Sequence, residues 1–332
     1  PPRLDSSAAS DVYKRQNHRR RLSLPLFALA IAVPILSMPA STLADPSPTL
    51  QDRVLSLATS SDPAIGDAPI AAIRGIKALY ELRNWEPAWN DESMIRELRE
   101  QVMRSVEHGL DPEDFHFRQL DLRLKAGTTD PQYLADTEII ATDALARLAF
   151  TLHFGKLNPE KLDPVWNFSR TINGRNVVQK VNDVLESGNI ARELEDAAPD
   201  LPYYNQLRGA LKDYRTIAAQ GGWPQIPGGE GMKLDATGPR VEALRARLRV
   251  TGDLSGPAPA DPSIFDEGLE AAVKHFQRRQ GIDADGKVGP RSLAELNVPV
   301  ADRIDQIRVN LERGRWVFRD VEDTFVLVNI AD

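Results

Sequence analysis

The stretch AAVKHFQRRQGIDADGKVGPRSLAEL, Ala271 to Leu296, contains two helix signals separated by turn signals. Val273 and Phe276 are three residues apart, which places them on one face of a helix. Gly281 can adopt the left-handed conformation that ends such a helix, and Asp285-Gly286 favours a tight turn. The stretch therefore predicts a compact pair of helices joined by a turn.

A second helix is expected to begin at Pro290, because the missing N–H of a proline costs little in a first helical turn. Upstream, the spacing of Val241, Leu244 and Leu248 predicts another short helix. Residues 223–299 are therefore expected to form a small three-helix domain.

Apolar residues recur at helical spacing through residues 66–222 as well. The patterns predict helices near Leu50–Leu57, Ile70–Leu79, Ile95–Leu110, Asp136–Phe154, Val177–Leu185 and Tyr204–Ile217. Asp91 is placed to cap one helix, and Pro112 to begin another. No alternating strand pattern precedes residue 324, so we predict one all-α domain that follows a linker at residues 45–65.

The pattern changes its period near the C-terminus. Ile304, Ile307 and Leu311 predict one more helix. The segment Thr324–Ile330 is rich in β-branched and aromatic residues, which is typical of a strand. We expect residues 300–332 to hold a linker helix and the first β-strand of a further domain that is truncated here.

The N-terminal part has the three components of a secretory signal peptide. Arg19–Arg21 precede the apolar run Leu22–Met38, and small residues follow up to Ala44. The run is short and holds two prolines, so it is poorly suited to span a membrane. We expect residues 17–44 to be a cleaved signal, with a retained membrane anchor as the alternative, and residues 1–16, which lack an initiator Met, to be a non-native extension.

Composition indicates a soluble globular chain of two or three domains, with 42% hydrophobic and 27% charged residues among 332. The net charge is −7, and residues 1–44 hold six basic and two acidic side chains, so the remainder is more acidic still. An acidic protein is poorly matched to nucleic acid, whose binding depends largely on Lys and Arg at phosphates. The chain has no Cys, which excludes disulfides, Cys-ligated zinc and a thiol nucleophile within these residues.

Taken together, the C-terminal motifs resemble the peptidoglycan-binding-like family of three-helix domains. The residues that carry this resemblance, to which we assign structural roles, are Phe276, Gln277, Gly281, Asp285, Gly286, Gly289 and Pro290. The segment Val241–Leu254 resembles the first helix of that family. The family's first Asp-Gly turn is replaced here by a Pro-rich insert, Gly256–Pro262, so a glycan groove that depends on that turn would be altered.

Five segments, in the same order, resemble the large periplasmic murein L,D-transpeptidases. They are LYELRNWEPAWN (79–90), HGLDPEDF (108–115), TDALARLAFTLHFGKLNP (142–159), PYYNQLRGALKDYR (202–215) and LERGRWVFRDVEDTFVLVNIAD (311–332). The resemblance implies a helical scaffold domain at 66–222, a peptidoglycan-binding-like domain at 223–299 and the start of a YkuD-type catalytic domain at 300–332. It also implies a periplasmic location in a Gram-negative type of envelope, with glycan strands and stem peptides of peptidoglycan as partners.

Members of that family work by covalent catalysis. A Cys thiolate attacks the donor stem peptide, a His acts as base, and backbone N–H groups stabilise the oxyanion. Those residues would lie in a Ser-His-Gly-Cys type of motif beyond the first strand, and neither that motif nor any Cys occurs here. We therefore assign no catalytic residue, metal ligand or cofactor to this chain, and we expect it to be inactive by itself.

Two other clusters have simpler structural interpretations. His108 and His116 lie near Asp111, Glu113 and Asp114 in a pattern that resembles a metal site, but such acids more often cap a helix.

The carboxylates Glu267 and Glu270 could serve glycan hydrolysis in principle, although a solvated helix face is the simpler explanation. For Tyr80, Trp85 and Trp89, packing in the core is favoured over stacking on sugars.

A basic group comprising Arg278, Arg279, Lys287 and Arg291 could meet acidic stem peptides, with ordinary solvated charges as the alternative. The first hypothesis is that the chain is the N-terminal part of a murein L,D-transpeptidase. A non-catalytic peptidoglycan-binding or adaptor protein is the second hypothesis, and a hydrolase that uses carboxylates is the third.

Overall fold

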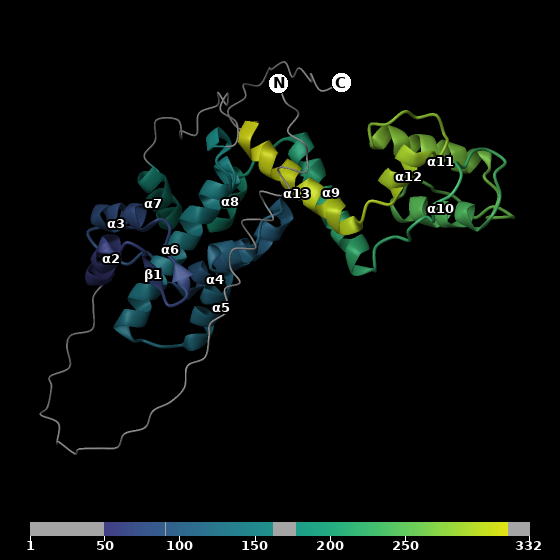
Figure 1. The fold of residues 1–332 in the computed structure, drawn as a ribbon. Helices are drawn as coiled ribbons and strands as arrows, with labels where there is room; N and C mark the ends of the chain where they lie inside the picture. The colour runs from purple at the N-terminus through teal and green to yellow at the C-terminus, as the bar shows by residue number, and fades with distance from the viewer. Residues whose placement is uncertain (1–49, 90, 162–176, 318–332) are drawn as a thin grey trace, which may run out of the picture. The chain divides into compact units, whose positions relative to one another are not determined.

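The computed structural model describes residues 50–89, 91–161 and 177–317 of the chain. Within these residues it contains twelve α-helices, short 3-10 helices (η) and one two-stranded sheet (Figure 1). The mainly α fold predicted from the sequence is therefore confirmed. In this described part, no helix has both the length and the apolar character that crossing a membrane requires.

Several predictions concern residues outside those ranges. The extension 1–16, the signal peptide 17–44, the first residues of the linker and the strand Thr324–Ile330 all lie outside the described residues. They stay predictions.

The chain folds as two compact units. The first comprises the described residues up to Arg208 and from Arg308 onward, and the second spans Gly209–Ile307. Each boundary falls inside a helix, α9 (Pro202–Ala219) and α13 (Val300–Val317). The chain therefore leaves the first unit along one continuous helix and rejoins it along another.

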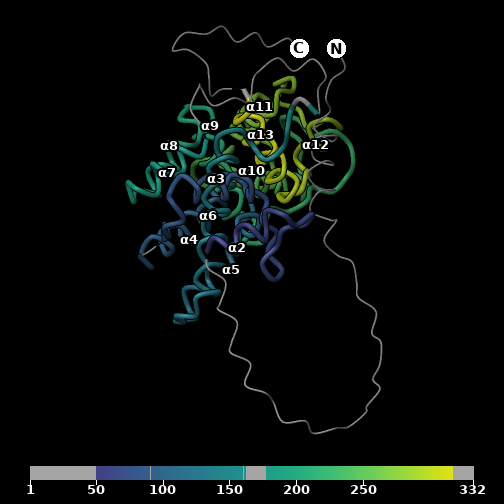
Figure 2. The backbone as a smooth tube through the Cα atoms, turned by 90° about the vertical axis from the view of Figure 1, so that its left-hand side faces the viewer, coloured from purple at the N-terminus to yellow at the C-terminus, as the bar shows by residue number. Residues whose placement is uncertain are grey.

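The first unit is built around the long helix α6 (Pro131–Phe154), whose residues are mostly buried. The other elements in chain order are α2 (Leu50–Thr59), β1 (Ala64–Ile65), β2 (Ala68–Pro69), α3 (Ile73–Leu82), α4 (Glu92–Arg104), η1 (Ser105–His108), η2 (Pro112–Phe115), α5 (Phe117–Ala126), η3 (Pro159–Lys161), α7 (Val177–Ser187) and α8 (Ile190–Ala197). Helices α2, α3, α4, α5 and α8 all pack on α6, and Figure 2 shows these segments gathered around it. A helix that is apolar on most sides needs such neighbours, which makes α6 the centre of the unit.

The start signals identified in the sequence are used as predicted. Asp91 caps α4 by accepting the Ser93 N–H at 2.8 Å, and Pro112 begins η2. Gly109 ends η1 with a φ of 76°.

Two helices and the short sheet were missed. Helix α5 buries only Leu120, although Phe117, Leu120 and Leu124 recur in it at helical spacing, and α8 spans barely two turns. Each strand of the β1–β2 hairpin is two residues long, which is too short for an alternating pattern.

A buried carboxylate holds the loop after α3 against α6. Glu138 accepts hydrogen bonds from the Tyr80 hydroxyl at 2.6 Å and from the backbone N–H groups of Ala88 and Trp89 at 2.8 and 3.0 Å. Burial raises the pKa of Glu138. Tyr80 and Trp89 are 0% and 5% exposed, so the predicted core packing of these two aromatics is confirmed, while Trp85 is half-buried.

The end of α13 is anchored in the first unit by Arg315, which is 2% exposed. Its guanidinium donates to the His108 carbonyl at 3.0 Å, to the Tyr204 hydroxyl at 2.8 Å and to the Glu312 carboxylate at 2.7 Å. Glu312 in turn accepts the Leu157 N–H at 2.8 Å. Four segments that are far apart in the sequence therefore meet at one ion pair.

Glycine allows α13 to approach this closely. Gly155 ends α6 with a φ of 81°, and a Cβ there would lie 2.6 Å from both Glu312 Oε1 and Trp316 Nε1. The residue that ends α6 therefore also makes space for the side chains of α13.

The same cluster keeps His108 neutral. Burial, together with the nearby cations Arg208 and Arg315, lowers the pKa of His108 to about 3. The Tyr204 oxygen already accepts from Arg315, so its hydroxyl proton is directed to His108 Nδ1, 3.0 Å away. This arrangement requires an unprotonated Nδ1.

We predict that the first unit loses stability on mild acidification because of His108. In the unfolded chain a histidine gains a proton near pH 6.5, whereas the buried His108 gains one only near pH 3, so its contribution is lost as pH falls below about 6.5. Between pH 7 and pH 5 the loss should reach on the order of 1–2 kcal/mol, measured by urea unfolding of the full chain.

The variant His108→Gln should be less stable at pH 7 but should show a smaller loss on acidification. His153→Gln, which changes a half-buried histidine on a different element, α6, is the matched control and should keep the wild-type slope. An unchanged pH slope in His108→Gln would contradict the assignment.

Candidate functional site

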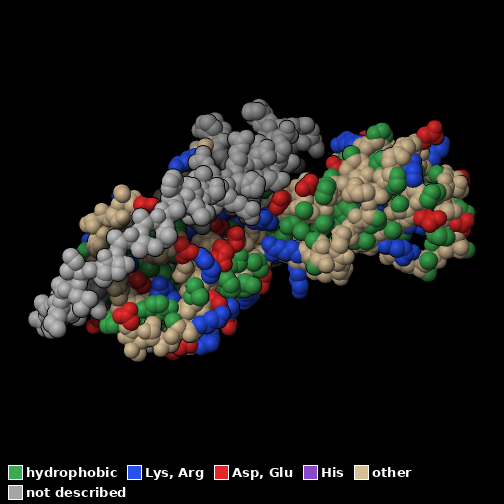
Figure 3. Space-filling model, turned by 60° about the horizontal axis from the view of Figure 1, so that its bottom comes forward, with side chains coloured by type: hydrophobic (Ala, Val, Ile, Leu, Met, Phe, Trp, Pro, Cys, Tyr) green, Lys and Arg blue, Asp and Glu red, His purple; other side chains and the backbone are tan. Residues whose placement is uncertain are grey.

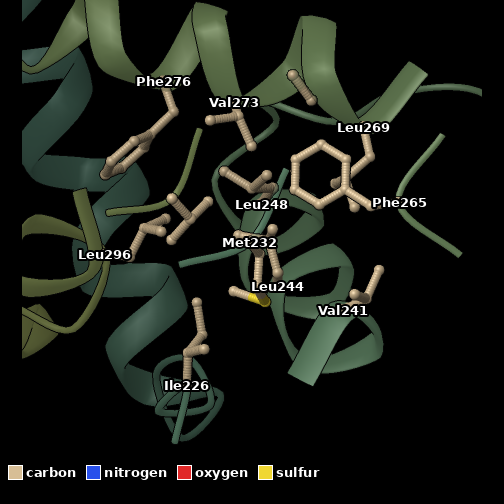
Figure 4. Packing of buried hydrophobic residues seen from close by; sticks show 12 residues of the cluster. Ile226, Met232, Val241, Leu244, Leu248, Phe265, Leu269, Val273, Phe276 and Leu296 are labelled. Atoms are coloured by element: carbon tan, nitrogen blue, oxygen red, sulfur yellow. The ribbon is translucent and has the colours of Figure 1, made fainter. Parts of the chain in front are cut away.

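The second unit contains α10 (Pro239–Val250), α11 (Glu267–Arg279) and α12 (Pro290–Leu296), as the sequence predicted. Its core is a single cluster of buried apolar side chains (Figure 4). The labelled members are Ile226, Met232, Val241, Leu244, Leu248, Phe265, Leu269, Val273, Phe276 and Leu296. Val273 and Phe276 point from α11 into this cluster, which fixes the direction of the remaining α11 side chains.

The buried side chain of Gln277 joins the two C-terminal helices. Its amide nitrogen lies 3.0 Å from Asp285 Oδ1, 2.9 Å from the Lys287 carbonyl and 3.0 Å from Ser292 Oγ. Its amide oxygen accepts the Gly286 N–H at 2.9 Å. An amide offers donors and an acceptor at one position, so one side chain ties the turn and α12 to α11.

The Asp285-Gly286 turn fits closely against α11. Gly286 has a φ of 78°, and a Cβ there would lie 2.7 Å from side-chain carbons of both Glu270 and Lys274. Asp285 also accepts the Lys287 N–H at 2.9 Å, which closes the turn. Glycine is therefore required at residue 286 both by the backbone conformation and by space.

The remaining motif residues end one helix and begin the next. Gly281 follows α11 with a φ of 65°, Gly289 is the N-cap of α12, and Pro290 is its first residue. These positions therefore fix the backbone from which the basic side chains extend into solvent.

All four basic residues singled out from the sequence are exposed, and three of them, Arg278, Lys287 and Arg291, lie close to the Gln277 network. Arg278 follows Gln277, Arg291 precedes Ser292, and the Lys287 carbonyl is bonded to Gln277, so all three emerge next to the same buried network. Among the described residues, none of the three forms an ion pair. They are therefore available to an acidic ligand.

The fourth, Arg279, is held by internal contacts. It donates to Asp253 at 3.1 and 2.6 Å and to the Tyr214 hydroxyl at 3.0 Å. Asp253, which sequence analysis did not single out, has a fully buried side chain and also bonds His275 Nδ1 at 2.9 Å. Although burial opposes it, the hydrogen bonds from Arg279 hold the pKa of Asp253 below its usual value.

Another buried cation escaped the sequence analysis. Arg247 on α10 is 1% exposed, stacks on the Trp223 ring at 3.8 Å and donates to the Leu296 carbonyl at 2.7 Å. Burial lowers its pKa to about 10. From the sequence alone, an arginine on an Arg-rich helix is expected to be solvated. No sequence pattern therefore indicated that Arg247 is buried.

The Pro-rich insert Gly256–Pro262 is held to α10 by arginines. Arg249 donates to the carbonyl of Gly256 at 3.1 Å, and Arg245 donates to that of Pro262 at 3.0 Å. These bonds fix both ends of the insert where the family resemblance placed an Asp-Gly turn.

Most of the residues considered for metal binding or hydrolysis are engaged in other contacts. His108 is bonded to Tyr204, His116 to Asp143 and Asp114 to Lys156, while Asp111 caps η2 and Glu270 pairs with Lys274. Within the described ranges, no three His, Asp or Glu side chains converge on a position where a metal ion could bind.

Comparison with protein families identifies both units. Residues 74–211 match the Scaffold domain family, and residues 237–296 match the peptidoglycan binding domain family. A search of curated proteins finds no match. The chain thus carries a scaffold domain followed by a peptidoglycan-binding domain, which supports a role related to the cell wall.

Figure 3 shows how charged side chains are distributed over one face of the molecule. Basic and acidic side chains are interspersed over it, without a broad area of one sign. Recognition by long-range charge is therefore not indicated by this face.

We predict that Gln277→Glu destabilises the second unit. A carboxylate there would face Asp285, the Lys287 carbonyl and Ser292 without the donors these groups now receive. The expected loss is about 2–3 kcal/mol, measured by thermal or urea unfolding at pH 7.

Gln280→Glu is the matched control, because Gln280 lies three residues further along and no hydrogen bond of its side chain is described. It should change stability by less than about 0.5 kcal/mol. Equal effects of the two substitutions would refute the role given to Gln277.

Proposed function

We propose that this chain is the N-terminal, non-catalytic part of a murein L,D-transpeptidase, an enzyme that cross-links or remodels peptidoglycan. The observation that carries the proposal is the presence of a scaffold domain and a peptidoglycan-binding domain, in that order, on one chain. The ordered motifs from Leu79 onward agree with it.

The chemistry of such an enzyme would be acyl transfer through a Cys thiolate. The sulfur attacks the carbonyl carbon of the L,D bond in the donor stem peptide, the C–S bond forms, and the terminal residue leaves as its amine. The amine of an acceptor stem then attacks the thioester and releases the thiolate. These 332 residues contain no Cys, so the nucleophile and its His base would be supplied by a domain that follows them.

This part of the protein would hold the cell wall and position the stem peptides. The second unit supplies peptidoglycan binding, and the first unit supplies a rigid helical body. We place the protein in the periplasm, exported by the signal peptide that residues 17–44 resemble.

The coding sequence beyond Asp332 tests this proposal directly. We expect an open frame that encodes, within about one further domain length, a His and a Ser-His-Gly-Cys type of motif. An in-frame stop codon directly after Asp332 would overturn the proposal.

A second candidate is a non-catalytic peptidoglycan-binding or adaptor protein. It is favoured by the three exposed cations Arg278, Lys287 and Arg291, which are free of ion pairs among the described residues. Such a surface would need no catalytic domain to attach the protein to acidic stem peptides.

We predict that charge reversal at Arg278 and Arg291 weakens co-sedimentation of the full chain with isolated sacculi. Each exposed charge contact contributes up to about 1 kcal/mol, so the double variant Arg278→Glu, Arg291→Glu should bind roughly tenfold more weakly at low salt. Arg279→Glu would not be a clean test, because it also breaks the pair with Asp253.

The matched control is Lys212→Glu, which reverses an exposed charge on α9. It should leave co-sedimentation unchanged. Equal pelleting of the double variant and the wild type would remove Arg278 and Arg291 from the binding surface.

A further inference from the structure

The first unit contains a cavity of about 760 Å³ between α3, α6 and α7. This volume falls in the range of pockets that bind small ligands, roughly 300–1,000 Å³. Much of its wall is apolar and includes Ile76, Leu79, Phe115, Phe150 and Val181. The cavity lies wholly within the first unit.

Basic residues outnumber acidic ones among the described residues that line this cavity. Within that described lining, Arg74, Arg147 and Lys156 accompany one acid, Asp114. Lys156 and Asp114 are paired at 2.5 Å and largely neutralise each other. Arg74 and Arg147 are therefore the cations of this lining that Asp114 does not neutralise.

The two arginines differ in their acidic partners. Arg74 is exposed and forms no ion pair among the described residues. Arg147 pairs with Asp143 through Nη1 at 3.5 Å, at the limit of hydrogen bonding, and the same Nη1 lies 3.5 Å from His116 Nε2.

Both oxygens of Asp143 have closer partners than Arg147. One accepts the Ala72 N–H at 2.7 Å, and the other is 2.7 Å from His116 Nε2. Asp143 is fully buried and His116 nearly so, which keeps this arrangement fixed. The Arg147 side chain is 26% exposed and lines the cavity, and its Nε and Nη2 have no hydrogen-bond partner among the described residues, so these donors remain available.

Apolar side chains border the same space and remain partly open to solvent. Phe150 and Val177 are 45% and 47% exposed, and both line the cavity. An occupant that matches both features has an anionic group for the guanidinium donors and small apolar groups for the walls. Arginine recognises a carboxylate through two parallel hydrogen bonds, which makes a carboxylate the best anion.

We propose that this cavity binds a short peptide that carries a free carboxylate and small side chains, as the stem peptide of peptidoglycan does. The identity of the peptide rests on the proposed function, whereas the chemistry of the site does not. A stem held here would be bound by the scaffold unit itself, independently of the peptidoglycan-binding domain.

The test is a titration of the full chain with a soluble stem tetrapeptide, in which calorimetry and the NMR shifts of cavity residues measure binding. Arg147→Met should weaken binding about ten- to hundredfold, because a charge-assisted hydrogen bond is lost. The fully amidated tetrapeptide should bind the wild type with a comparable loss. Arg96→Met, on α4 and outside the cavity lining, is the matched control and should bind normally.

A second variant guards against misfolding of Arg147→Met. Ala146→Phe fills the cavity without changing charge and should also abolish binding. Binding that survives both substitutions would place the peptide elsewhere and overturn the proposal. Absence of binding at millimolar peptide would overturn it as well, and would point to another part of this chain as the occupant.

Two outcomes separate this proposal from the proposed function. Equal affinity for an unrelated acidic all-L peptide would keep the carboxylate site but overturn the stem peptide as its ligand. A stop codon after Asp332 combined with stem binding that depends on Arg147 would overturn the transpeptidase and support the cavity.

Discussion

The buried guanidinium of Arg315 is the constraint on which the architecture of the first unit depends. A charge removed from water is costly unless close partners replace the lost hydration. Here the partners are Glu312, the Tyr204 hydroxyl and the His108 carbonyl, which lie on α13, α9 and η1. None of these elements can move away without leaving a buried charge unpaired, so the ion pair fixes where the chain rejoins the unit.

That constraint explains features that look unrelated in the sequence. His108 has to stay neutral, because two arginines and a donated hydroxyl proton surround it. Residue 155 has to be a glycine, because the Glu312 carboxylate and the Trp316 indole occupy the space of a Cβ. Gln277 plays the corresponding part in the second unit, where a neutral amide meets donors and acceptors at once. Each unit is thus held by buried polar side chains as well as by its apolar core.

Much of the helical fold could be predicted because its signals are local. Apolar spacing located α9 and α11, and the caps at Asp91 and Pro112 depend only on their immediate neighbours. Helix α5 was missed although Phe117, Leu120 and Leu124 recur in it at helical spacing. The candidate site was harder to predict. Arg279 pairs with Asp253, which lies 26 positions away in the sequence, and this pairing removes one of the four candidate cations. Residues from three separate helices contribute to the lining of the cavity, so the periodicity of a single segment does not predict it.

The two units present cations in different ways, and this bears on how each would bind. Arg278, Lys287 and Arg291 lie on an exposed surface, where salt screens a charge within about 10 Å. Contacts made there would be weak and sensitive to salt, which suits attachment to a polymer that offers many equivalent sites. Arg147 lines a concave, largely apolar wall, and the carboxylate nearest to it is already used by His116 and Ala72. A guanidinium in that setting is screened less and meets a carboxylate in a defined orientation, so on the proposals above the second unit would provide attachment and the first would provide selection among stem peptides.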